Sequence, residues 1–136
     1  MELVKLKWPE IALLSVIMDY ERTWRRSVLN EELVSTDEAG ENGLFYRWVH
    51  QQHIPRIYTG GISFKNRKLI QSYAATMRQA QLLERFGKYK STRKALLLFE
   101  EIGTDWQRWP MEISVSAHLN QFTDPIKRKE HLFKSQ

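Results

Sequence analysis

The chain has no cysteine among its 136 residues. That absence excludes a disulfide framework, a thiol nucleophile and a zinc site built on thiolates. It also fits a reducing compartment, so we expect a cytoplasmic protein. His50 and His53 lie three residues apart, a spacing that two metal ligands on one helix face can share, but they have no acidic neighbour. We therefore expect neither a bound metal nor a cofactor.

A long apolar run is also missing. The longest one near the start, Ile11 to Met18, contains Ser15 and is far shorter than the roughly 20 residues of a membrane-spanning helix. No signal-peptide core follows the first lysines. We expect no membrane partner. The hydrophobic fraction of 42% is sufficient for one core, which predicts a single domain over residues 1–136.

Recognisable catalytic patterns are lacking as well. The sequence holds no G-x-S-x-G and no H-E-x-x-H, and no Walker loop follows the Gly60-Gly61 pair, which instead indicates a loop with positive φ. A nuclease needs clustered carboxylates for its metal ions. Here the carboxylates either crowd between Glu31 and Glu41 or stand singly. We therefore expect that the protein is not an enzyme.

The apolar spacing predicts a mostly α fold, a compact bundle of five or six helices. The first eight residues alternate between apolar and basic, which fits either a short strand or an extended arm. We expect Ser63 and Ser91 to cap two of the helices, and Gly87 and Gly103 to end them. The expected helices cover residues 9–33, 44–50, 63–87, 92–102 and 111–122, with a short last one from Asp124.

Two assignments keep alternatives. Met111 to Ser116 alternates like a strand, but its continuation suits a helix, and we assign a helix. Trp106 and Trp109 flank Arg108, so they could stack on unpaired bases or anchor the core; we favour anchors. The residues expected in the core include Leu13, Ile17, Trp24, Met77 and Leu97.

Positive charge gathers in one stretch. Lys65 to Lys94 contains nine Lys or Arg residues against one acid, Glu84, within a chain of net charge +5. Arg67, Gln71, Arg78 and Arg85 fall on one line of the expected helix, beside its apolar stripe. A line of guanidinium groups suits phosphate oxygens, although a solvated polar face has the same pattern.

The basic stretch continues past that helix, and a second basic patch lies near residue 25. We expect thirteen residues to contact nucleic acid: Arg67, Lys68, Gln71, Arg78, Arg85, Lys88, Tyr89, Lys90, Arg93 and Lys94 in the first stretch, and Arg22, Arg25 and Arg26 in the second.

These observations predict a non-catalytic subunit that binds nucleic-acid backbone, RNA or single-stranded DNA, without reading sequence. Its expected partners are nucleic acid, larger protein subunits and copies of itself. The alternative is a protein-interaction module, an adaptor or inhibitor, whose basic face binds an acidic protein. Salt-dependent binding of nucleic acid distinguishes the two.

A small, basic, helical chain without catalytic residues resembles the small subunit of CRISPR effector complexes. The resemblance covers the whole chain in size, charge and helical pattern, and it involves no diagnostic motif. It implies contacts to nucleic-acid backbone and to large protein neighbours within a ribonucleoprotein for antiviral defence. No residue is carried over from that family.

Overall fold

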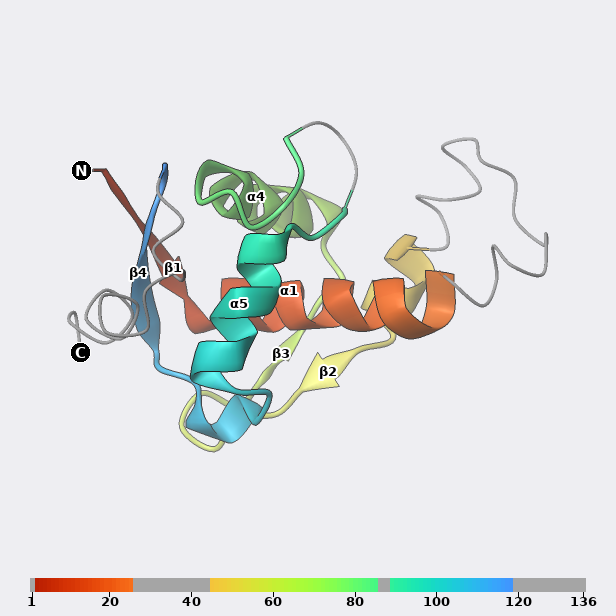
Figure 1. Ribbon diagram of the computed structural model, residues 1–136. Helices are drawn as coiled ribbons and strands as arrows, with labels where there is room; N and C mark the ends of the chain where they lie inside the picture. Colours follow the sequence, from red (N-terminus) through yellow and green to blue (C-terminus); the bar gives the residue numbers. More distant parts are fainter. Residues whose placement is uncertain (1, 26–44, 86–88, 119–136) are drawn as a thin grey trace.

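The computed structural model describes residues 2–25, 45–85 and 89–118 (Figure 1). The acidic stretch from Glu31 to Glu41, the last expected helix, Arg26 and Lys88 lie outside these residues. So do the side chains of Trp24 and Arg25.

The predicted bundle of five or six helices is wrong. The described residues form an α+β fold in which helices pack with two small antiparallel sheets, each of two strands. In chain order the elements are β1 (Leu3–Lys7), α1 (Trp8–Asp19), the π-helix η1 (Tyr20–Arg25), a helical segment over residues 45–50, β2 (His53–Ile54), β3 (Ile62–Ser63), α4 (Arg67–Gln79), α5 (Arg93–Ile102), the 3-10 helix η2 (Trp106–Arg108) and β4 (Glu112–Ser116).

The main correction concerns β4, for which a helix was expected. It pairs antiparallel with β1, from Leu3 opposite Ser116 to Lys7 opposite Glu112. The β1 residues Val4 and Leu6 are buried, and they face Val115 and Ile113, which are buried too. Two β-branched residues at alternate positions favour a strand once a partner is present. That partner is the N-terminal segment, for which a strand was one of the two expected forms.

The central element is α1. Nine of its twelve residues are buried, so the helix presents no polar face. It begins at Trp8 with Pro9 in its first turn, as expected, and the Glu10 carboxylate accepts a hydrogen bond from the Lys7 N–H at 3.3 Å. The other elements surround it in Figure 1: α4 packs along it, and α5 crosses it steeply.

The ends of the helices α4 and α5 match the sequence-based prediction at Gly103 only. Asn66, not Ser63, caps α4, since its side chain accepts from the N–H groups of Lys68 and Leu69. The helix ends at Gln79 rather than Gly87, and Gln81 adopts a positive φ of 59° just beyond. Gly103 ends α5 with a φ of 81°, as expected, but the residue at its cap position is Thr92, not Ser91.

A glycine pair shapes the loop between β2 and β3. Gly60 and Gly61 have φ values of 73° and 85°, which confirms the prediction of positive φ. A Cβ at Gly61 would also lie 2.7 Å from the Ile54 carbonyl oxygen. Only glycine allows the backbone to approach so closely here.

The core contains most of the residues expected in it. Leu13, Ile17 and Met77 are fully buried, and Leu97 is half-buried. Trp109 is 2% exposed, and its indole N–H donates to the Gly103 carbonyl at 2.8 Å, so it anchors the fold as expected. Trp106 is half-buried. Among the described residues, no helix combines the length and apolar character needed to cross a membrane.

Substitutions in α5 test these burial assignments. Leu98 is fully buried, so Leu98→Ala should lower the free energy of unfolding by about 2–5 kcal/mol. Leu96, on the same helix, is 49% exposed, and Leu96→Ala should change it by less than about 1 kcal/mol. Urea unfolding of both variants measures the difference. Equal losses would show that the faces of α5 are assigned wrongly.

Candidate nucleic-acid interface

Two tyrosines form the centre of the candidate site. The Tyr46 and Tyr89 hydroxyl oxygens are 2.6 Å apart, a short hydrogen bond between residues from distant parts of the sequence. Phe45 stacks on Tyr89, with ring centroids 4.1 Å apart, and meets Tyr20 edge-on at 5.4 Å. Since Phe45 is 2% exposed, the tyrosine pair stands directly on the hydrophobic core.

Residues of α4 complete the site. The Arg67 guanidinium carbon lies 4.3 Å from the Tyr46 ring centroid, and that of Arg78 lies 5.5 Å from the Tyr89 ring centroid. Between them, the Gln71 amide donates to the Tyr46 hydroxyl at 3.4 Å. We call these five residues, Tyr46, Tyr89, Arg67, Gln71 and Arg78, the tyrosine–arginine cluster. Each arginine is close enough to its ring for a cation–π interaction.

Burial changes the acidity of Tyr89. Desolvation is the largest cause that raises its pKa well above the usual range, followed by the hydrogen bond with Tyr46. The nearby charges of Arg78 and Arg67 lower that pKa by less. The hydroxyl therefore stays protonated at neutral pH.

Three of the four residues expected on one line of α4 do lie together. Arg67, Gln71 and Arg78 meet in one cluster, as their spacing predicts. Arg78 is half-buried, and its Nε donates to the Glu84 carbonyl at 3.0 Å, so it is less solvated than expected. Arg85 lies beyond the end of α4, and therefore helical spacing does not place it on this face.

The described lysines of the basic stretch and Arg93 are either exposed or buried. Lys68, Lys90 and Arg93 are exposed. Lys94, in contrast, is 7% exposed, and its amine donates to the Ser116 carbonyl of β4. The prediction that Lys94 contacts nucleic acid on the surface is wrong in this respect, because the amine points into the fold and supports the β1–β4 sheet.

The second basic patch is reduced to one described side chain. Arg22 pairs with Asp19 at 2.7 Å, and both side chains are exposed. Such a local ion pair on an exposed helix face accounts for Arg22 without a nucleic-acid contact. The side chain of Arg25, together with Arg26, lies outside the described residues.

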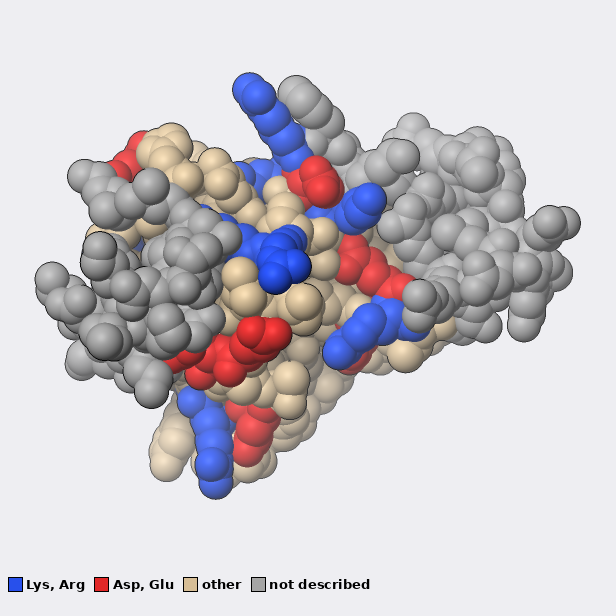
Figure 2. Space-filling view, in the orientation of Figure 1, with Lys and Arg blue, Asp and Glu red and all other residues tan. Residues whose placement is uncertain are grey.

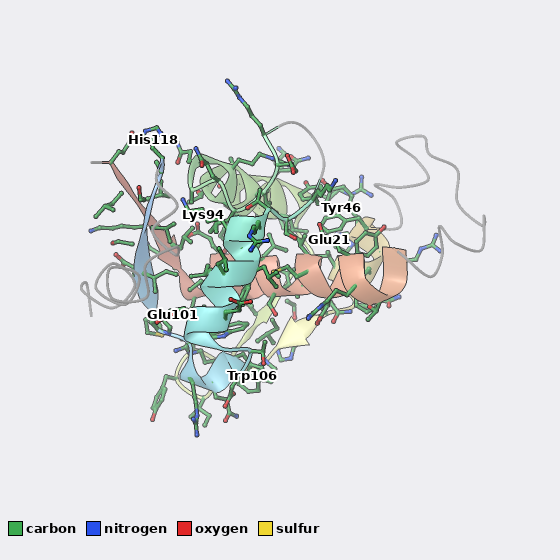
Figure 3. The ribbon with its side chains drawn as sticks, viewed as in Figure 1. Glu21, Tyr46, Lys94, Glu101, Trp106 and His118 are labelled. Carbon is green, nitrogen blue, oxygen red and sulfur yellow. The ribbon has the colours of Figure 1, made fainter. Side chains whose placement is uncertain are left out.

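Sequence reasoning missed two residues of this region. Tyr46 belongs to the 45–50 segment, and its role depends on the distant Tyr89, which no local pattern reveals. Glu21 of η1 accepts hydrogen bonds from the Ser91 N–H at 2.6 Å and the Ser91 hydroxyl at 2.5 Å. Figure 3 shows Glu21 and Tyr46 at the same end of the molecule, beside η1. Glu21 therefore holds the chain near Tyr89 in place.

The charged residues of α5 differ between its two ends. Arg93, which is exposed, and the buried Lys94 begin this helix, and Glu100 and Glu101 lie in its last turn. Figure 2 shows basic side chains over the start of α5, with acidic ones close beside them, and further acidic side chains over the end of α5. Within the described residues, no group of three His, Asp or Glu side chains could hold a metal ion.

No protein-family model, curated protein or solved structure matches the chain. The resemblance to the small subunit of CRISPR effector complexes stays a prediction that no comparison tests. Its helical pattern has to be corrected, because the described residues include two β-sheets.

The buried Lys94 predicts a pH-dependent stability. Burial lowers its pKa from 10.5 to about 8, so between these values the unfolded chain binds more protons than the folded one. The free energy of unfolding should therefore rise with pH over this window. The pKa of Tyr89 is raised, which acts in the opposite direction above its ordinary value of 10.0. Urea unfolding from about pH 7 to about pH 9.5 separates the two effects.

Lys94→Met is the matched control, since it keeps the apolar stem and removes the amine. Its free energy of unfolding should change little over the same pH range. If the variant kept the rise seen in the wild type, another group would be responsible for it.

Proposed function

We propose that the protein binds the phosphate backbone of single-stranded nucleic acid, RNA or DNA, without reading its sequence. It would act as a non-catalytic subunit of a larger cytoplasmic ribonucleoprotein. The observation that carries this proposal is that two arginines on one face of α4, Arg67 and Arg78, are both held against tyrosine rings. Their guanidinium groups are thus positioned before a ligand arrives.

A tyrosine ring is a suitable partner for an arginine that has to bind phosphate. A carboxylate would neutralise a guanidinium, whereas the Tyr46 ring orients that of Arg67 and leaves its charge and N–H donors available. Among the described residues, no acidic side chain pairs with Arg67 or with the neighbouring Lys68. Two adjacent uncompensated cations favour an anionic ligand.

Their place in the helix supports the same proposal. Arg67 and Lys68 lie in the first turn of α4, which contains no acidic residue. Cations are unfavourable at a helix N-terminus, where the macrodipole is positive, by about 0.3–1 kcal/mol each. These side chains therefore do not serve helix stability, and a bound phosphate would relieve their repulsion.

The raised pKa of Tyr89 favours binding over catalysis. A tyrosine that attacks a phosphodiester needs a lowered pKa or an adjacent base. The pKa of Tyr89 is raised instead, and the groups beside its hydroxyl are Tyr46 and two arginines. The pair therefore serves as a support for the arginines in this proposal.

A second candidate function, protein interaction, is favoured by the loop between β2 and β3. Ile57 and Tyr58 are 79% and 89% exposed at its tip. The loop is fixed from within by Arg56, which donates to the Trp109 carbonyl at 2.6 Å and lies 5.3 Å from the Trp8 ring centroid. Large apolar side chains on a rigid loop suit contact with a partner protein.

A salt titration tests the first candidate. Arg67→Ala and Lys68→Ala should each weaken binding to a mixed-sequence single strand and flatten its dependence on salt by about one unit of slope. The loss should be similar for unrelated sequences, because phosphates alone are contacted. Fluorescence anisotropy of a labelled oligonucleotide provides the measurement.

Arg108→Ala is the matched control. It removes the same net charge, but Arg108 lies in η2 and pairs with Asp105. Figure 1 places η2 away from α4. It should change affinity and slope much less than Arg67→Ala. Binding that all three variants weaken equally would indicate a net-charge effect only. A wild type that binds no nucleic acid at low salt would favour the protein-interaction module.

A further inference from the structure

The contact between Arg67 and Tyr46 has a second consequence for the ligand. The guanidinium carbon lies 4.3 Å from the ring centroid, so Tyr46 covers one side of this group. Tyr46 itself is only 7% exposed, whereas Arg67 is an exposed residue. The side of the guanidinium away from Tyr46 is therefore the one open to solvent.

We propose that the outer face of Arg67 stacks on an unpaired base, so that the guanidinium lies between the base and the Tyr46 ring. This inference rests on the proposed function and specifies its ligand: a strand whose bases are free to leave their stack. Every base has a π face, so such a contact adds affinity without reading sequence. Arginine planes are common stacking partners for bases of single strands.

Several contacts keep this platform in place. Tyr46 is bound through its hydroxyl to Tyr89 at 2.6 Å and to Gln71 at 3.4 Å. Phe45 packs beneath the pair in the core. A rigid ring below the guanidinium reduces the entropy lost when a base stacks on it. The neighbouring Lys68 is exposed and contacts no ring of the described residues, and it supplies charge for the phosphate of the same nucleotide.

In a duplex the base faces are covered by their neighbours, and stacking on Arg67 would require the strand to open. The platform therefore predicts a preference for single strands over duplexes, in addition to the charge attraction that both share. This preference is what separates the inference from simple backbone binding.

The test compares two ligands of equal length and charge: oligothymidylate, and a strand in which every base is replaced by an abasic site. The wild type should bind oligothymidylate about fivefold or more tightly, as expected for one stacked base. Arg67→Lys keeps the charge and removes the plane, so this ratio should fall to near one while the affinity for the abasic strand stays the same. Oligouridylate, run in parallel, separates RNA from DNA.

Lys68→Ala is the matched control, because it removes a charge without a stacked plane. It should weaken binding to both strands by the same factor and leave the ratio unchanged. A wild-type ratio near one, or a ratio that survives in Arg67→Lys, would overturn the stacking inference while backbone binding still stands. A higher ratio in Arg67→Lys would overturn it too, since the base would then displace residue 67 and stack on Tyr46. Failure to bind either strand would remove the proposed function itself.

Discussion

The fold depends on one constraint: α1 has no polar side. Nine of its twelve residues are buried, so other elements must cover it in every direction. An isolated helix of this composition would expose a continuous apolar surface to water. The β1–β4 sheet, α4, α5 and the 45–50 segment provide the cover. Several of these elements are short, and short elements are stabilised mainly by packing rather than by their own length.

The same constraint positions the tyrosine–arginine cluster. Phe45 packs edge-on against Tyr20, the first residue after α1, and the tyrosine pair stands on Phe45. Because α4 and the 45–50 segment both lie on the core, Arg67 and Tyr46 are brought together by packing. Glu21 fixes the third part of the cluster by binding Ser91, two residues from Tyr89. A surface cluster is thus connected to the core through rings and hydrogen bonds, which restrict the motion of its side chains.

Local patterns predicted what depends on neighbours in the sequence. Four features follow from spacing or side-chain chemistry within a few residues: Pro9 in the first turn of α1, the end of α5 at Gly103, the positive φ of Gly61, and the shared face of Arg67 and Arg78. Three features depended on distant partners and could not be predicted in this way. The Met111–Ser116 segment becomes a strand because β1 pairs with it, Lys94 turns inward toward Ser116, and Tyr46 meets Tyr89. Each of these contacts joins residues more than twenty positions apart.

The charged residues at the ends of α4 and α5 can be compared with what the helix macrodipole favours. Both helices begin with a basic pair, and α5 ends with Glu100 and Glu101, which is the reverse of what the helix macrodipole favours. In α5 the arrangement has a local explanation, since Lys94 is buried and bonded to Ser116. In α4 the described residues offer no such local explanation for the basic pair. Asn66 already satisfies two of the free N–H groups at the start of the helix, and the contact of Arg67 within the described residues is with the Tyr46 ring. A helix that keeps an unfavourable charge, oriented by a tyrosine and facing solvent, is better explained by a ligand than by stability. The first turn of α4 is therefore the place where the requirements of folding and those of binding can be separated by experiment.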